Sequence, residues 1–173
     1  MEPSTRTRSS FELAGKYLGA DVNNITPSGS SMGKGESFSY TLLILSYMGT
    51  DAIVMRHKAE GAPLYATKAV DPIIINAGDG AHEHPTQALL DMFSIMEKKE
   101  TLEGKKIVIV GDISHSRVAR SDIYGMTKMG ADVHLAGPRT MVYPELEKLG
   151  VTVHHDVREA VEGADVVNVL RIQ

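Results

Sequence analysis

The sequence contains no cysteine, which excludes disulfide bonds and zinc sites built on cysteine ligands. No apolar run approaches the roughly 20 residues that a membrane-spanning helix needs. The first residues are polar and basic with no apolar segment behind them, so we expect no signal peptide, no membrane partner and a cytoplasmic location. A formal net charge of −4 argues against a general nucleic-acid-binding protein, which normally carries an excess of lysine and arginine.

Three well-known ligand-binding motifs are also missing. The glycine-containing loop at 30–36 lacks the strand context and spacing of a Walker A loop, which argues against nucleotide binding. After the apolar run 107–111, only the first glycine of a Gly-x-Gly-x-x-Gly pattern is present, so we expect no NAD. His82-Glu83-His84 does not have His-Glu-x-x-His spacing, and Pro85 starts a helix just after it. We therefore expect neither a cofactor nor a metal.

The 173 residues are 42% hydrophobic and 23% charged, which is typical of a globular protein of one large or two small domains. Apolar strands alternate with helices almost from end to end, which predicts an α/β fold of parallel sheets with helices on both faces. A polar connector near residue 100 suggests two units, and both ends of the chain look cut. Helices are expected at 9–18, 36–48, 62–69, 84–98, 117–129, 144–149 and 157–162, and strands at 22–25, 52–55, 72–76, 107–111, 133–136, 151–154 and 166–170.

The segment Ser4-Thr5-Arg6-Thr7-Arg8 opens the first helical stretch and is rich in hydroxyl and guanidinium groups. A helix N-terminus carries about half a positive charge and unpaired N–H donors. Arginine adds planar, paired donors that suit phosphate. The segment is therefore either a site for a doubly charged oxyanion or a polar helix cap, because serine and threonine are common capping residues.

Further candidate ligands follow the ends of expected strands, where open parallel sheets bind their ligands. Arg56-His57 follows the strand 52–55 and is either an anion ligand or an exposed basic pair. His84 offers a hydrogen-bond donor for a substrate carbonyl, and Gln87 offers both a donor and an acceptor. Arg117 stands at an expected helix start, where it can clamp a carboxylate, whereas Arg120 one turn later can be structural.

Three other segments carry polar side chains. Lys34 lies between two glycines, either in a mobile arm that delivers a cation to a bound anion or in a flexible surface loop. Arg171 and Gln173 end the last strand and fall on the same side of it by alternation. His154-His155-Asp156 has the pattern of a solvated strand end.

Taken together and in this order, the motifs closely resemble those of the aspartate carbamoyltransferase catalytic chain, over the whole sequence. Ser-Thr-Arg-Thr-Arg and His-Pro-Thr-Gln are shared by carbamoyltransferases generally. Ser116-Arg117-Val-Ala-Arg-Ser121 and the pair Arg171 and Gln173 point to aspartate, whereas ornithine enzymes usually carry an Asn-Val-Ala-Asn type of segment. The resemblance implies a carbamoyl-phosphate domain at about 1–98 and an incomplete aspartate domain at 99–173.

The resemblance also implies residue roles and partners. His84 and Gln87 would position the carbamoyl group, and Arg56 would reach both the phosphate and the carbonyl oxygen. Ser31 and Lys34 would act in the active site of a neighbouring subunit, so a homotrimer is implied, with regulatory subunits as further candidate partners. Phosphate would be bound by Ser4, Thr5, Arg6 and Thr7, and aspartate by Arg117, Arg171 and Gln173.

The implied reaction transfers the carbamoyl group of carbamoyl phosphate to the amine of L-aspartate, giving N-carbamoyl-L-aspartate and phosphate for pyrimidine synthesis. No cofactor is needed, because Arg6, Arg56, His84, Lys34 and Thr7 supply positive charge and donors where negative charge develops. Two alternatives remain open at this point. One is an ornithine or other carbamoyltransferase, and the other is an inactive fragment that retains only carbamoyl-phosphate binding.

Overall fold

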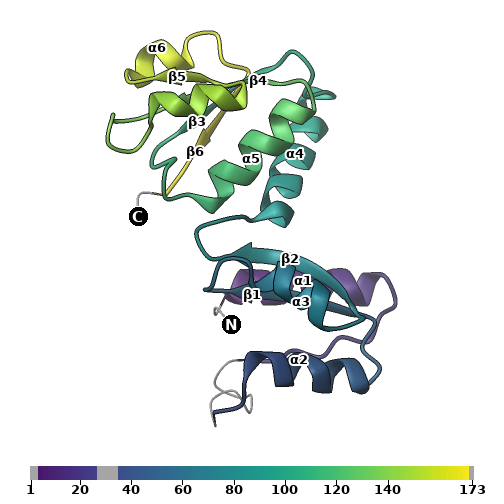
Figure 1. Cartoon of the computed structure of the whole chain (residues 1–173). Coiled ribbons are helices and arrows are strands. Elements are labelled where there is room, and N and C mark those ends of the chain that lie inside the picture. Colours follow the sequence, from purple (N-terminus) through teal and green to yellow (C-terminus); the bar gives the residue numbers. More distant parts are fainter. Residues whose placement is uncertain (1–3, 27–34, 172–173) are drawn as a thin grey trace. The chain divides into compact units, whose positions relative to one another are not determined.

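A computed structural model describes residues 4–26 and 35–171, and the chain forms two compact units, Met1–Gly80 and Ala81–Gln173 (Figure 1). Both are α/β units with parallel sheets, which confirms the expected fold class. None of the helices in the described part of the chain has the length and apolar character needed to cross a bilayer.

The first unit contains a two-stranded parallel sheet with helices packed on it. Its small core joins Leu42, Met55 and Ala66, one from each of a helix, a strand and a second helix. Pro63 falls in the first turn of the helix that follows the first strand, a position where the missing N–H costs no hydrogen bond. The elements are α1 (Thr5–Tyr17), α2 (Phe38–Tyr47), β1 (Ala52–His57), α3 (Ala62–Ala69) and β2 (Ile73–Asp79), with β1 parallel to β2.

The strand expected at 22–25 is wrong, because this segment has no regular structure and no strand partner. It folds back on α1 instead. Val22 lies against Gly15, where an added Cβ would come within 2.5 Å of the Val22 Cγ2 atom. The Asn24 amide donates to the Glu12 carboxylate at 2.6 Å. Local contacts with the preceding helix therefore replace the strand pairing that the apolar pattern suggested.

The second unit contains a four-stranded parallel sheet in the order β5-β4-β3-β6. The expected helix at 144–149 forms as a 3₁₀ helix, η3. The elements are α4 (Pro85–Lys99), β3 (Lys106–Val110), α5 (Arg117–Lys128), β4 (Asp132–Ala136), η3 (Pro144–Leu149), β5 (Thr152–His154), α6 (Val157–Val161) and β6 (Val166–Val169).

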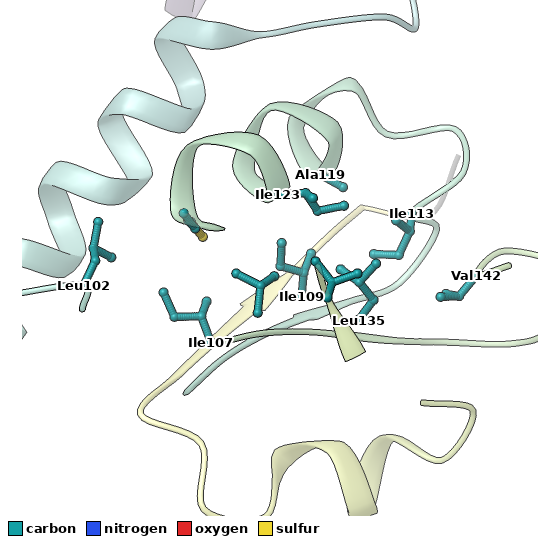
Figure 2. Close-up of a cluster of buried hydrophobic side chains, with 11 residues drawn as sticks. Leu102, Ile107, Ile109, Ile113, Ala119, Ile123, Leu135 and Val142 are labelled. Atoms are coloured by element: carbon teal, nitrogen blue, oxygen red, sulfur yellow. The ribbon is translucent and has the colours of Figure 1, made fainter. Parts of the chain in front are cut away.

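Helices cover both faces of this second sheet. Ile107 and Ile109 of β3 point to the face that carries α5, where they belong to the cluster shown in Figure 2. Val108, between them, points to the opposite face and packs with Ala160 of α6. Apolar residues on both faces of one strand are what the continuous run at 107–110 predicts. Helix α4 packs along α5 and so belongs to this unit.

Candidate functional site

The N-terminus of α1 combines a serine cap with an exposed, cationic first turn. Ser4 is the N-cap, and its Oγ accepts the Thr7 N–H at 3.2 Å and donates to Thr7 Oγ1 at 2.9 Å. Thr5 and Arg6 are exposed, and the first turn contains no acidic residue. The N–H groups of Thr5 and Arg6 precede the first intrahelical hydrogen bond, so they are available to a ligand. The two sequence interpretations thus coexist, because the segment caps the helix and still offers donors to an anion.

Arg56 lies half-buried near the carboxyl end of β1, opposite an irregularity in β2. Met55 pairs with Asn76 and His57 pairs with Asp79, so β2 contains one more residue than β1 between these two pairs. Asn76 stabilises the extra residue by accepting the Gly78 N–H at 2.9 Å. Bulges of this kind bend the strand that carries the extra residue, which here is β2, beside Arg56.

His57, next to Arg56, has a structural environment. Its Nδ1 accepts the Ala59 N–H at 2.9 Å, and its ring lies 4.8 Å from that of Phe38 between centroids. Burial lowers the pKa of His57, so the neutral ring is favoured. The basic pair therefore contributes one candidate ligand, Arg56, rather than two.

His84 is the N-cap of α4 and is buried. Its backbone N–H donates to Ser121 Oγ of α5 at 2.9 Å, and the Ser121 hydroxyl donates in turn to the Glu83 carboxylate. The Thr86 hydroxyl lies 3.4 Å from His84 Nδ1. A hydrogen donated to Nδ1 leaves the proton of a neutral imidazole on Nε2, where it can be donated to a substrate carbonyl.

Gln87 lies one turn further along α4 and is partly buried. Its Nε2 donates to the Asp91 carboxylate at 2.9 Å. Burial raises the pKa of Asp91, and the hydrogen bond from Gln87 opposes this effect only in part. Sequence reasoning did not find Asp91. The available signal was the spacing of four residues from Gln87, which brings two helical side chains together.

Arg117 is the first residue of α5, directly after a loop ordered by Asp112. The buried Asp112 carboxylate lies 2.9 Å from His115 Nδ1 and accepts the His115 N–H at 3.3 Å. Ser116 caps the helix by accepting the Ala119 N–H at 3.1 Å. Arg117 is thus held at the carboxyl end of β3 and at a helix N-terminus, as predicted. Arg120 is exposed and lines a cavity of about 230 Å³ between α5 and η3. Arg117 is not one of the residues that line this cavity.

The remaining expected residues lie at the end of the chain or outside the described part. Arg171 is exposed and follows Leu170, whose N–H donates to Val110 O at 2.8 Å as the last hydrogen bond of β6 to the sheet among the described residues. Ser31, Lys34 and Gln173 fall outside the residues that the structure describes.

Residues 154–156 are more structured than a solvated strand end. His154 Nε2 lies 2.8 Å from His134 Nδ1, with the rings stacked, and Asp156 caps α6 by accepting the Arg158 N–H. His155 and Asp156 are exposed, and His155 Nδ1 lies 3.3 Å from Gly137 O. Within 4–26 and 35–171, no group of three or more histidines or carboxylates is arranged to hold a metal.

Asp122 of α5 is a second acidic residue that sequence reasoning missed. It is fully buried, and its Oδ2 accepts the Asn168 amide of β6 at 3.0 Å. Its Oδ1 is buried with no hydrogen-bond partner among the described residues. Burial, and secondarily the charge of Asp91, raise the pKa of Asp122 to about 8. The signal in the sequence was a carboxylate next to the apolar positions 119, 123 and 126 of α5.

Comparison with known protein families gives two matches that together cover nearly the whole chain. The model described as "Aspartate/ornithine carbamoyltransferase, carbamoyl-P binding domain" matches residues 1–97. The model described as "Aspartate/ornithine carbamoyltransferase, Asp/Orn binding domain" matches residues 103–173.

Curated relatives carry a consistent name. The aspartate carbamoyltransferase catalytic subunit of Desulforamulus reducens is 62% identical over 172 residues, covering 99% of this chain and 55% of the relative. That of Moorella thermoacetica is 56% identical, covering 99% and 56%. The chain therefore spans about half the length of the curated relatives it matches.

Solved structures share the fold over the full chain. Aspartate transcarbamoylase from Trypanosoma cruzi, in complex with aspartate and phosphate, has a TM-score of 0.89 and 33% identity, covering 100% of this chain and 60% of that one. The catalytic subunit of the M. jannaschii enzyme has a TM-score of 0.86 and 37% identity, covering 99% and 59%.

Proposed function

The chain belongs to the aspartate/ornithine carbamoyltransferase family, and on that premise we propose that it binds carbamoyl phosphate and L-aspartate and transfers the carbamoyl group between them. The products are N-carbamoyl-L-aspartate and phosphate, and the reaction serves de novo pyrimidine synthesis in the cytoplasm. The names of the curated relatives support aspartate rather than ornithine as the acceptor.

The N-terminus of α1 is the observation that carries this proposal. Ser4 caps the helix through Thr7, which leaves the N–H groups of Thr5 and Arg6 and the exposed Arg6 guanidinium for a ligand. Backbone donors, a helix dipole and a guanidinium in one turn are a combination that favours a dianion such as a phosphoryl group. We assign Ser4, Thr5, Arg6 and Thr7 to the phosphate.

The carbamoyl group is assigned to the N-terminus of α4, with Arg56 as a further donor. His84, with its Nδ1 near the Thr86 hydroxyl, donates from Nε2 to the carbamoyl oxygen. Gln87 contacts the carbamoyl nitrogen. Arg56 stabilises both the phosphate and the carbonyl oxygen. Aspartate is assigned to Arg117, at the start of α5, and to Arg171 and Gln173.

These residue types support the reaction without a covalent intermediate. The neutral amine of aspartate attacks the carbamoyl carbon, and the carbonyl electron pair moves onto oxygen. The tetrahedral oxyanion collapses, the C–O bond to phosphate breaks, and the departing phosphate takes up the proton that the amine nitrogen loses. Arg6, Arg56 and His84 supply positive charge and donors for the developing negative charge, and loss of one such donor typically costs ~10²–10³ in rate. Holding two small reactants at attack distance contributes much of the remainder.

We further propose residues 1–98 as the carbamoyl-phosphate domain and 99–173 as part of the aspartate domain, in keeping with the ranges of the two family matches. This boundary follows α4, whereas the two compact units divide before α4, between Gly80 and Ala81. Ser31 and Lys34 are assigned to the active site of a neighbouring subunit in a homotrimer. Regulatory subunits are proposed as additional partners of that trimer.

Calorimetric titration tests the proposal with two ligands, carbamoyl phosphate and the bisubstrate analogue N-(phosphonacetyl)-L-aspartate. We expect Arg6→Ala to weaken both by roughly 10- to 100-fold, as for loss of charged hydrogen bonds. Lys16→Ala is the matched control, because it removes one positive charge from the last turn of the same helix. Equal affinities for wild type and Arg6→Ala would refute the phosphate assignment.

The aspartate half is tested by a second pair of variants. Arg117→Ala should weaken the bisubstrate analogue and leave carbamoyl phosphate unchanged, whereas Lys128→Ala, in the last turn of α5, should change neither. Radiolabelled carbamoyl transfer to aspartate and to ornithine then compares the two acceptors. A preference for ornithine would overturn the assignment of substrate. If the aspartate part of the analogue adds no affinity, the chain binds only carbamoyl phosphate.

A further inference from the structure

The orientation of the Gln87 side-chain amide is set by a carboxylate. Gln87 and Asp91 lie one turn apart on α4, and the amide Nε2 donates to Asp91 Oδ1 at 2.9 Å. An ionised carboxylate only accepts hydrogen bonds, so it must face the NH₂ end of the amide. The carbonyl oxygen of Gln87, at the other end of the planar amide, is then the group left for a ligand.

The hydrogen bond from Gln87 favours the ionised form of Asp91, whereas burial raises the pKa of Asp91. Helices α4 and α5, which carry Asp91 and Asp122, pack on each other (Figure 1), and the charge of Asp91 raises the pKa of Asp122. Asp122 is the more deeply buried of the two, and burial raises its pKa to about 8. At neutral pH the proton therefore resides on Asp122. A neutral Asp122 adds no negative charge beside Asp91, which accepts the hydrogen bond from Gln87.

We propose that Asp91 is a positioning residue, which fixes the Gln87 amide so that its carbonyl oxygen accepts an N–H of the carbamoyl group. This inference rests on the proposed function, which assigns Gln87 to the carbamoyl nitrogen. The fixed amide would make the site select a carbamoyl group over an acetyl group. A carbamoyl ligand carries two N–H donors at this place, whereas an acetyl ligand of the same shape carries a methyl group and leaves the Gln87 oxygen without a partner. A buried polar group that is left without a partner weakens binding.

Two stable phosphonates measure this selectivity. Phosphonoacetamide carries the carbamoyl NH₂, and acetonylphosphonate replaces it by CH₃ and is otherwise alike. In titrations of the full chain at pH 7, we expect wild type to bind phosphonoacetamide about 5- to 10-fold more tightly, a ratio typical of one hydrogen bond. In Asp91→Asn the Gln87 amide can take either orientation, because asparagine both donates and accepts. The ratio of the two affinities should then fall to within about twofold.

Matched variants separate positioning from general stability. Glu12→Gln removes the carboxylate from an exposed pair with the same spacing, Glu12 and Lys16, and should leave the ratio unchanged. Gln87→Ala should abolish the ratio, and adding Asp91→Asn to Gln87→Ala should change it no further. Binding of both phosphonates reduced equally in Asp91→Asn would indicate a structural role and overturn the inference. A Gln87→Ala protein that keeps the ratio would also overturn it, whether or not Asp91→Asn folds.

Failure of the proposed function gives a different result. If wild type binds neither phosphonate, the carbamoyl-phosphate site itself is refuted. If wild type binds both and prefers phosphonoacetamide, and Asp91→Asn keeps that preference, only the role of Asp91 is refuted.

Discussion

Replacing Asp122 by asparagine should remove a large pH dependence from the free energy of unfolding of the second unit. Asp122 is fully buried between α5 and β6 and accepts one hydrogen bond, from Asn168. Burial, with a contribution from the charge of Asp91, raises its pKa from 3.8 to about 8. The folded chain therefore keeps a proton that the unfolded chain releases. Asparagine has nearly the same shape, keeps an acceptor for Asn168 and has no proton to lose.

The sign and size of the effect follow from that shift. The pKa of Asp122 is higher in the folded chain than in the unfolded chain. The contribution of Asp122 to the free energy of unfolding is therefore fully present below pH 3.8 and is lost as the pH rises towards 8. Each unit of pH in this window costs the folded state about 1.4 kcal/mol. Between pH 5 and pH 8 wild type should lose about 3 to 4 kcal/mol relative to Asp122→Asn.

Urea unfolding followed by far-ultraviolet circular dichroism at four pH values from 5 to 8 measures this difference. Subtracting the variant from wild type at each pH removes the contributions of titrating groups that do not interact with Asp122. The control is Asp21→Asn, which makes the same substitution at an exposed aspartate of the first unit, in the irregular segment after α1. Parallel curves for wild type and Asp122→Asn would refute a neutral buried carboxyl at this position.

Two further predictions concern the second sheet. Gly137→Ala should destabilise this unit by about 1–3 kcal/mol, because the new Cβ would lie 2.7 Å from Gly111 O and 2.9 Å from Val142 Cγ2; an unfolding midpoint equal to wild type would contradict the close approach. His154→Gln should reduce acid sensitivity, because burial and the charge of His134 lower the pKa of His154, so that its contribution to stability is lost as the pH falls below about 6.5. The measurement is the difference in free energy of unfolding between wild type and His154→Gln at pH 7 and at pH 5. This difference should be smaller at pH 5, and an equal difference at both pH values would contradict the prediction.

The alternation of helices and strands was predictable because the signals are local. The run at 107–110 is apolar on both faces, and Pro85 and Ser116 mark helix starts. The expected strand at 22–25 did not form because pairing of a strand depends on a partner that is distant in the sequence. A strand needs a partner to accept its hydrogen bonds, and no local pattern reveals that Val22 packs on α1 instead.

The residues of the candidate site also differ in whether local sequence signals could identify them. Residues that stand next to strand ends or helix starts, such as Arg6, His84 and Arg117, could be chosen from their place in the sequence. Residues that act through packing could not. Asp122 meets Asn168 across 46 positions of sequence, and only the packing of α5 on the sheet brings them together. The pairing of His134 with His154 likewise depends on the register of β4 and β5.

The central claim is that guanidiniums and helix N-termini far apart in the sequence bind one dianionic ligand. A crystal structure of the chain with N-(phosphonacetyl)-L-aspartate tests it most directly. The account predicts the phosphonate within about 3 Å of the Thr5 and Arg6 N–H groups, the analogue's carbonyl oxygen on His84, and a carboxylate on Arg117. An analogue bound with its phosphonate away from the start of α1, or with His84 and Arg117 contacting nothing of it, would contradict the account.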